Sequence, residues 1–234
     1  MKKILLYICT IFFLVPLHAQ VVPADSKKDD AKSDDVPTAA EKHAYWAAAG
    51  AGYYFLPLAP VNAQLGAMGI KTGFTNAIGL GIERGYSVVT SKLSHAITGM
   101  MSFHYLLPQH ISSSGDSLKA SLNGYNAQFD LIGANFLKSE TMTLTGGLGW
   151  AFGRLKLVEN ALSAKTTYLN KYFAPELRLE FNVRLAEHFF IGLRYAYRYD
   201  ITRWRWTKSG SNTMDLPSTD MSGTTVGAFI GYGK

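Results

Sequence analysis

The residue with the clearest potential for catalysis is a histidine that lies close to hydroxyl groups. His104 follows Ser102 by two residues, a spacing that puts both side chains on one face of a β-strand. A histidine in such a setting can act as a general base when an acidic group orients its ring. Because the sequence places no carboxylate beside His104, we interpret it as a satisfied interior histidine and keep a catalytic base as the alternative.

Charged residues occur at alternate positions within segments that are otherwise apolar. From Phe173 to Leu185 the odd positions are all apolar, whereas glutamate, arginine and asparagine occupy most of the even positions. The segment from Phe189 to Ile201 repeats this alternation. A period of two residues predicts β-strands with one apolar face and one charged face. The charged candidates are Glu83, Asp130, Glu176, Arg178, Glu180, Arg184, Arg194, Arg198 and Asp200.

These strands are long enough to cross a membrane. A globular strand has typically about five or six residues, and a tilted membrane-spanning strand needs about 9–11. Short turns are expected at 90–94, 138–141 and 186–188, and they alternate with long loops at 57–74, 108–122, 158–171 and 205–222. We predict strands near residues 45–56, 75–89, 95–107, 123–137, 142–157, 172–185, 189–204 and 223–233.

The N-terminus has the features of an export signal. Lys2 and Lys3 precede a short apolar run, and Ala19 provides a small residue at a plausible cleavage point. The alternative, a membrane-spanning helix, needs roughly 20 apolar residues, and this run is shorter. Residues 20–43 have many charges and no aromatic side chain, which predicts a disordered periplasmic extension. The expected domains are therefore a signal peptide at 1–19, the extension at 20–43 and a β-domain at 44–234.

The last predicted strand carries a recognisable motif. Its polar, glycine, apolar and aromatic positions are Thr225, Gly227, Ile230 and Tyr232, although Gly233 and Lys234 follow the aromatic residue. This pattern resembles the carboxy-terminal assembly signal of small outer-membrane barrels of the OmpX and OmpA transmembrane-domain type. The resemblance implies an all-β, eight-stranded antiparallel up-and-down transmembrane β-barrel in the bacterial outer membrane. It also implies periplasmic termini and the barrel assembly machinery as a partner.

In such a barrel the charged faces must point inward, because the outer face meets lipid. A three-residue turn at Ala186–His188 would place Glu180 opposite Arg194, and Glu176 opposite Arg198. We therefore predict two cross-strand ion pairs inside the barrel. Eight strands leave just enough room for side chains, which favours a packed polar plug over the alternative of an ion path or proton relay.

A basic and aromatic cluster lies at the end of the seventh predicted strand, at the point where that strand would leave the membrane. Tryptophan at this depth is typical of an aromatic belt, and arginine beside it can meet lipid phosphates. We predict contact with the phosphates of lipopolysaccharide, with ordinary interface anchoring as the alternative. The residues concerned are Arg203, Trp204, Arg205 and Trp206, and Lys156, Lys165, Lys171 and Lys208 are expected near the same rim.

A serine-rich stretch begins at His110. Its first residues, from His110 to Ser112, resemble the His-x-Ser motif of outer-membrane lipid A deacylases, which carry a glutamate on the next strand. The matching region here, near Gly124 and Asn126, has no glutamate. A catalytic serine needs an oriented base, so we interpret the stretch as an outer loop.

The sequence as a whole favours a non-enzymatic integral outer-membrane protein with a structural or interaction role. A lipid-modifying enzyme and a small pore are the alternatives. The chain carries no glycine-rich phosphate loop, paired zinc ligands or nucleic-acid motif, so we expect no cofactor, no metal and no nucleic-acid partner. The expected partners are outer-membrane lipids, the assembly machinery and other envelope proteins.

Overall fold

The computed structural model describes residues 42–89, 97–113, 117–139, 141–161, 164–202, 206–210 and 215–233. The predicted signal peptide and nearly all of the predicted extension lie outside this part of the chain, so both stay predictions.

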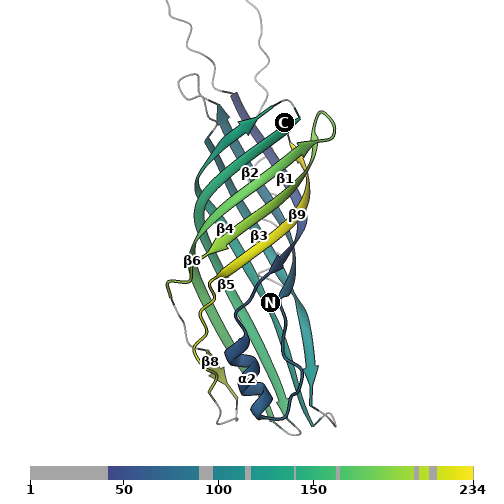
Figure 1. Ribbon diagram of the computed structural model, residues 1–234, viewed down its shortest axis with the longest axis vertical. Coiled ribbons are helices and arrows are strands. Elements are labelled where there is room, and N and C mark those ends of the chain that lie inside the picture. The colour runs from purple at the N-terminus through teal and green to yellow at the C-terminus, as the bar shows by residue number, and fades with distance from the viewer. Residues whose placement is uncertain are drawn as a thin grey trace, which may run out of the picture. The chain divides into compact units, whose positions relative to one another are not determined.

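One antiparallel sheet closes into a barrel (Figure 1). Strands β1 to β7 pair in sequence order, β7 pairs with β9, and β9 pairs with β1, so that eight strands close the ring. A ninth, short strand, β8, pairs with β6. This confirms the predicted eight-stranded fold. The strands are β1 (Lys42–Tyr54), β2 (Ala77–Val89), β3 (Ile97–Ser112), β4 (Leu118–Lys138), β5 (Met142–Ala161), β6 (Ala164–Arg184), β7 (Phe189–Arg198), β8 (Thr207–Ser209) and β9 (Gly223–Gly233).

The two ends of the barrel differ. We call the end with the start of β1, the end of β9 and the turn at residues 185–188 the turn end. The opposite end, which carries helix α2 (Ala59–Ala67) and β8, is called the loop end (Figure 1).

The strands reach further at the loop end than the sequence predicts. The expected loops at 108–122 and 158–171 are wrong, because β3 pairs with β4 as far as Ser112 and Lys119, and β5 pairs with β6 as far as Ala161 and Ala164. The expected loop at 57–74 contains α2, and the one at 205–222 contains β8. Strand β7 ends at Arg198, before the predicted residue 204. In these extensions the apolar residues face the barrel interior, whereas in the membrane-spanning part they face outward. The sequence pattern of the membrane-spanning strands therefore did not predict the extensions.

The barrel wall has an apolar outer face along its middle. Leu177, Leu179, Leu193 and Tyr195 are each about half exposed, whereas the residues between them are buried. This alternation confirms that the charged face of β6 and β7 points inward and the apolar face outward. Among the described residues, no helix is long and apolar enough to cross a bilayer.

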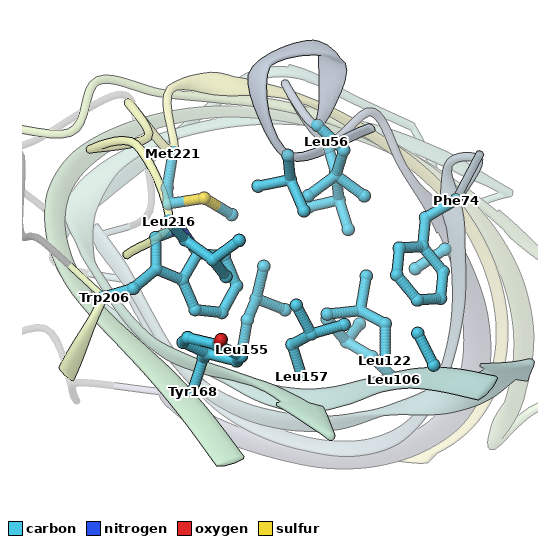
Figure 2. Packing of buried hydrophobic residues seen from close by; sticks show 14 of the residues in the cluster. Leu56, Phe74, Leu106, Leu122, Leu155, Leu157, Tyr168, Trp206, Leu216 and Met221 are labelled. Carbon is cyan, nitrogen blue, oxygen red and sulfur yellow. The ribbon is translucent and has the colours of Figure 1, made fainter. Parts of the chain in front are cut away.

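The loop end encloses a hydrophobic cluster (Figure 2). Pro60 occupies the first turn of α2, where its missing N–H costs no hydrogen bond, and Val61 and Leu65 of this helix are fully buried. Leu155 and Leu157 of β5 belong to the same cluster. The barrel is therefore filled by apolar side chains at its loop end. Other members of the cluster include Leu56, Phe74, Leu106, Leu122, Tyr168, Trp206, Leu216 and Met221.

Candidate functional site

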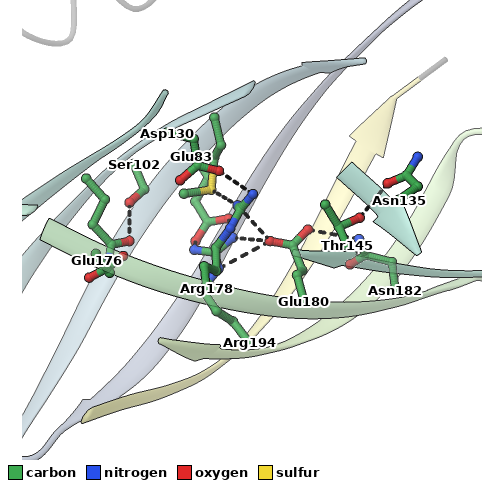
Figure 3. A network of polar contacts seen from close by, with 12 residues as sticks. Glu83, Ser102, Asp130, Asn135, Thr145, Glu176, Arg178, Glu180, Asn182 and Arg194 are labelled. Carbon is green, nitrogen blue, oxygen red and sulfur yellow. Dashed lines mark hydrogen bonds and ion pairs between the residues drawn. The ribbon is translucent and has the colours of Figure 1, made fainter. Parts of the chain in front are cut away.

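The centre of the barrel holds a network of buried charges (Figure 3). The guanidinium of Arg194 lies between two carboxylates from different strands. It contacts both carboxylate oxygens of Glu83, with Nη2 to Oε2 at 2.6 Å, and its Nη2 lies 2.7 Å from Oε2 of Glu180. All three side chains are at least 95% buried. Paired groups of opposite charge offset the cost of removing each charge from water.

A second arginine extends the network. Arg178 pairs with Asp130 of β4, and its Nη1 lies 3.0 Å from Oε2 of Glu180. Glu180 thus bridges Arg178 and Arg194. Because the strands that carry these residues surround the barrel axis, the network joins β2, β4, β6 and β7 across the interior. We call Glu83, Asp130, Arg178, Glu180 and Arg194 the charged layer.

The register of β6 and β7 agrees with the prediction from the turn length. Glu180 lies opposite Arg194, and the two form an ion pair. Glu176 also lies opposite Arg198, but the predicted ion pair between them is wrong. Glu176 instead accepts a hydrogen bond of 2.8 Å from Gln128.

Arg198 turns away from Glu176 toward the loop end. Its Nε donates to the carbonyl oxygen of Met221, and its Nη1 donates to the Thr225 hydroxyl, each at 3.0 Å. Its guanidinium also lies over the rings of Tyr54 and Tyr172, 5.6 and 5.5 Å from their centroids. These cation–π contacts and hydrogen bonds explain why register alone did not predict its partner.

Two further predicted interior charges lie away from the charged layer. Arg184 is exposed at the turn end, so its assignment to the buried interior is wrong. Its side chain lines the cavity at the rim of the barrel instead. Asp200 is fully buried beyond the end of β7. Its carboxylate accepts hydrogen bonds from the main-chain N–H of Met221 at 3.0 Å and of Thr202 at 2.9 Å, so it orders the loop end.

His104 has an acidic neighbour that the sequence did not reveal. Its Nε2 lies 3.3 Å from Oε1 of Glu83, which comes from the adjacent strand β2. The hydroxyl of Ser102, however, donates to Gln128 at 2.7 Å, and His104 is 95% buried. The Ser102 hydroxyl is thus bonded to Gln128, whereas a nucleophile–base pair requires hydrogen-bond contact between the hydroxyl and the base.

A cavity of about 170 Å³ opens at the turn end. Arg178 and Glu180 lie at its inner limit, and Arg184, His188 and Trp46 contribute to its wall. The charged layer separates this cavity from the hydrophobic cluster of the loop end. Within the described residues, no group of three or more histidine, cysteine, aspartate or glutamate side chains is placed to hold a metal ion.

The motif that resembles the deacylases has no orienting acid opposite it. His110 and Ser112 are exposed, and their partners on β4 are Ser121 and Lys119. Of the predicted lipid-phosphate contacts, Arg203, Trp204 and Arg205 lie outside the described residues. Trp206 is 93% buried in the hydrophobic cluster, and its Nε1–H donates to the Thr219 hydroxyl at 3.0 Å. Its assignment to the outer aromatic belt is therefore wrong.

The predicted assembly motif lies on the strand that closes the barrel. β9 pairs with both β1 and β7. Thr225 faces inward to Arg198, whereas Ile230 and Tyr232 are exposed on the outer wall. A Cβ on Gly227 would lie 3.1 Å from the main-chain oxygen of Ala51. Recognition of this strand by an assembly machinery stays a prediction.

Comparison with known proteins gives likenesses of fold only. No model of a known protein family and no curated protein matches the chain. Ail of Yersinia pestis, in complex with the heparin analogue sucrose octasulfate, is 14% identical, with a TM-score of 0.49 over 82% of this chain and 99% of Ail. A major outer membrane protein from Thermus thermophilus is 10% identical, with a TM-score of 0.48 over 82% and 99% of the two chains.

The N-terminal β-barrel domain of Pseudomonas aeruginosa OprF is 11% identical, with a TM-score of 0.42 over 82% of this chain and 97% of that domain. An eight-stranded outer-membrane β-barrel has a closed sheet, an apolar outer wall and a polar interior. The structure of this chain has all three features.

Proposed function

We propose that this protein is a closed, non-enzymatic barrel of the bacterial outer membrane with a structural and interaction role. The observation that carries this proposal is that two groups of side chains fill the barrel interior at two different levels along its axis. The charged layer occupies the middle, and the hydrophobic cluster occupies the loop end. A pore would need a continuous water-filled path, and an enzyme would need an accessible reactive group.

The proposed orientation places the turn end in the periplasm and the loop end outside the cell. Short turns on the periplasmic side and longer connections on the outer side are the rule for such barrels. The extended parts of β3 to β6 would then rise above the membrane as a rigid sheet, supported from inside by the hydrophobic cluster. This sheet is the surface on which we expect interactions with outer-membrane lipids and envelope proteins.

Conductance in planar lipid bilayers tests whether the barrel is closed. We expect purified wild-type protein to give no stable channel. The double substitution Asp130→Ala with Arg178→Ala removes the ion pairs of Arg178 with Asp130 and with Glu180 from the charged layer, without changing the net charge. It should also give no channel, because the hydrophobic cluster still closes the loop end. Stable channel openings by the wild-type protein would refute the closed barrel and support the small pore.

Hydrolysis of purified lipid A tests the enzymatic alternative. We expect no release of fatty acid when wild-type protein in detergent is incubated with lipid A, because His110 and Ser112 have no acid opposite them. If the wild-type protein released fatty acid and the His110→Ala variant did not, the protein would be a deacylase and the proposal would be wrong.

A further inference from the structure

The outer wall changes from apolar to basic at one level on two paired strands. Phe152 and Phe173 are directly opposite each other on β5 and β6, and they are the last apolar outward-facing residues before the first charged ones. The next outward positions toward the loop end are Arg154 and Lys171, which are also directly opposite each other. The strand register therefore aligns the two boundaries.

Aromatic rings mark this level as the edge of the membrane. Trp150 stacks on Phe173 with ring centroids 4.5 Å apart, and Phe152 lies 4.9 Å from the same ring. On the other side of β5, Tyr125 is opposite Arg154 in the β4 register. Aromatic side chains concentrate at both interfaces of membrane proteins, at the level of the lipid headgroups. Arg154 and Lys171 therefore lie at headgroup level.

Among the described residues, the positive charge at this level has no partner in an ion pair. Side chains directly opposite in an antiparallel pair have Cβ atoms roughly 4.5–5.5 Å apart, and like charges there repel each other. In the described part of the chain, neither Arg154 nor Lys171 forms an ion pair, and Lys156 on the next outward position of β5 forms none either. The nearby Glu159 is 97% buried and faces inward.

The outward positions that the structure describes in this region contain no acidic residue. Beyond the aromatic level, the outward-facing residues of the described parts of β4, β5 and β6 are Ser121, Asn123, Lys119, Arg154, Lys156, Val158, Asn160, Lys165, Thr167, Leu169 and Lys171.

We propose that Arg154, Lys171 and Lys156 form a binding site for a phosphorylated glycolipid of the outer leaflet. We call these three residues the basic wall site. The phosphate would lie between the opposed Arg154 and Lys171, where it relieves their repulsion, and Lys156 would contact a second phosphate or its sugar. The acyl chains of the same lipid would pack on Phe152 and Phe173 just below. The identity of the lipid rests on the proposed orientation, with the loop end outside the cell.

Lipid binding to the detergent-solubilised protein tests the site. Native mass spectrometry would compare retention of bisphosphorylated lipid A with that of its fully dephosphorylated form, each added in increasing amounts. We expect the wild-type protein to retain the bisphosphorylated form more tightly. The double substitution Arg154→Gln with Lys171→Gln should weaken that binding by roughly tenfold or more, since a cation near an anionic lipid surface contributes on the order of 1 kcal/mol. Binding of the dephosphorylated form should not change.

A charge-matched control uses Lys71→Gln with Lys165→Gln, two exposed lysines away from the aromatic level. This variant should bind as the wild type does. Equal retention of the two lipid forms by the wild type, or an equal loss in both double variants, would overturn the proposal. Full competition by millimolar inorganic phosphate would also overturn it, because it would show a site for free phosphate rather than lipid. None of these results depends on whether the barrel conducts.

Discussion

Arg194 and Glu83 are 111 residues apart in sequence, yet both nitrogens at the tip of the guanidinium contact the two oxygens of the carboxylate. The same guanidinium also reaches Glu180, its cross-strand neighbour. One arginine therefore ties β7 to the neighbouring β6 and, across the barrel, to β2. This relationship makes Arg194 the central residue of the charged layer.

Replacement of Arg194 with methionine should destabilise the barrel strongly. The substitution leaves the carboxylates of Glu83 and Glu180 buried without their shared counter-charge, and removal of one partner of a buried ion pair costs about 3–5 kcal/mol. Urea unfolding of the protein reconstituted in lipid vesicles, followed by tryptophan fluorescence, measures this change. Arg184→Met at the exposed turn-end rim is the matched control and should leave the unfolding midpoint unchanged. Similar midpoints for the two variants would show that the charged layer is not stabilising.

The tryptophans should respond differently to quenchers in the membrane. Trp150 stacks on Phe173 of the outer wall, whereas Trp206 is buried in the hydrophobic cluster. In vesicles of brominated phospholipid, we expect Trp150→Phe to remove a quenched part of the fluorescence and Trp206→Phe to remove an unquenched part. Strong quenching of Trp206 would restore the aromatic-belt position that the sequence suggested for it.

Gly153 should tolerate no side chain. A Cβ at this position would fall within the ring of Tyr172, whose hydroxyl donates to Asn126 at 2.7 Å. We expect Gly153→Ala to destabilise the barrel by about 1–3 kcal/mol, as overpacking of an interior does. In helix α2, a Cβ on Gly66 meets nothing within 4 Å, so Gly66→Ala should be neutral or stabilising by up to roughly 1 kcal/mol. The same unfolding experiment measures both, and a harmless Gly153→Ala would contradict the tight packing of Tyr172.

Tyr232 should matter for assembly in cells. If the last strand is an assembly signal, Tyr232→Ala should lower the amount of folded barrel in the outer-membrane fraction of an expressing bacterium. Spontaneous refolding of the same variant in detergent should stay efficient, because its side chain lies exposed on the outer wall. Tyr199→Ala, an exposed aromatic residue beyond the end of β7, is the control. Equal assembly of the two variants would argue against the motif.

The number of barrel strands, the direction in which their charges face and the register of the β6–β7 hairpin could all be predicted from the sequence alone. Side-chain alternation in a strand has a fixed period of two, and a short turn fixes which residues are opposite, so the pairing of Glu180 with Arg194 follows from the order of residues. These are local properties of the chain.

Closure of the barrel determines which side chains meet in its interior. Glu83 reaches Arg194 and His104 because the closed sheet brings β2 opposite β7 and beside β3, and no local pattern encodes that meeting. The strand extensions were not predicted because their apolar residues face an interior that is filled by α2 and the segment around Trp206. Where the barrel wall leaves the lipid, the apolar side chains change from the outer face to the inner face of the sheet. The basic wall site likewise exists only because the β5–β6 register sets Arg154 opposite Lys171.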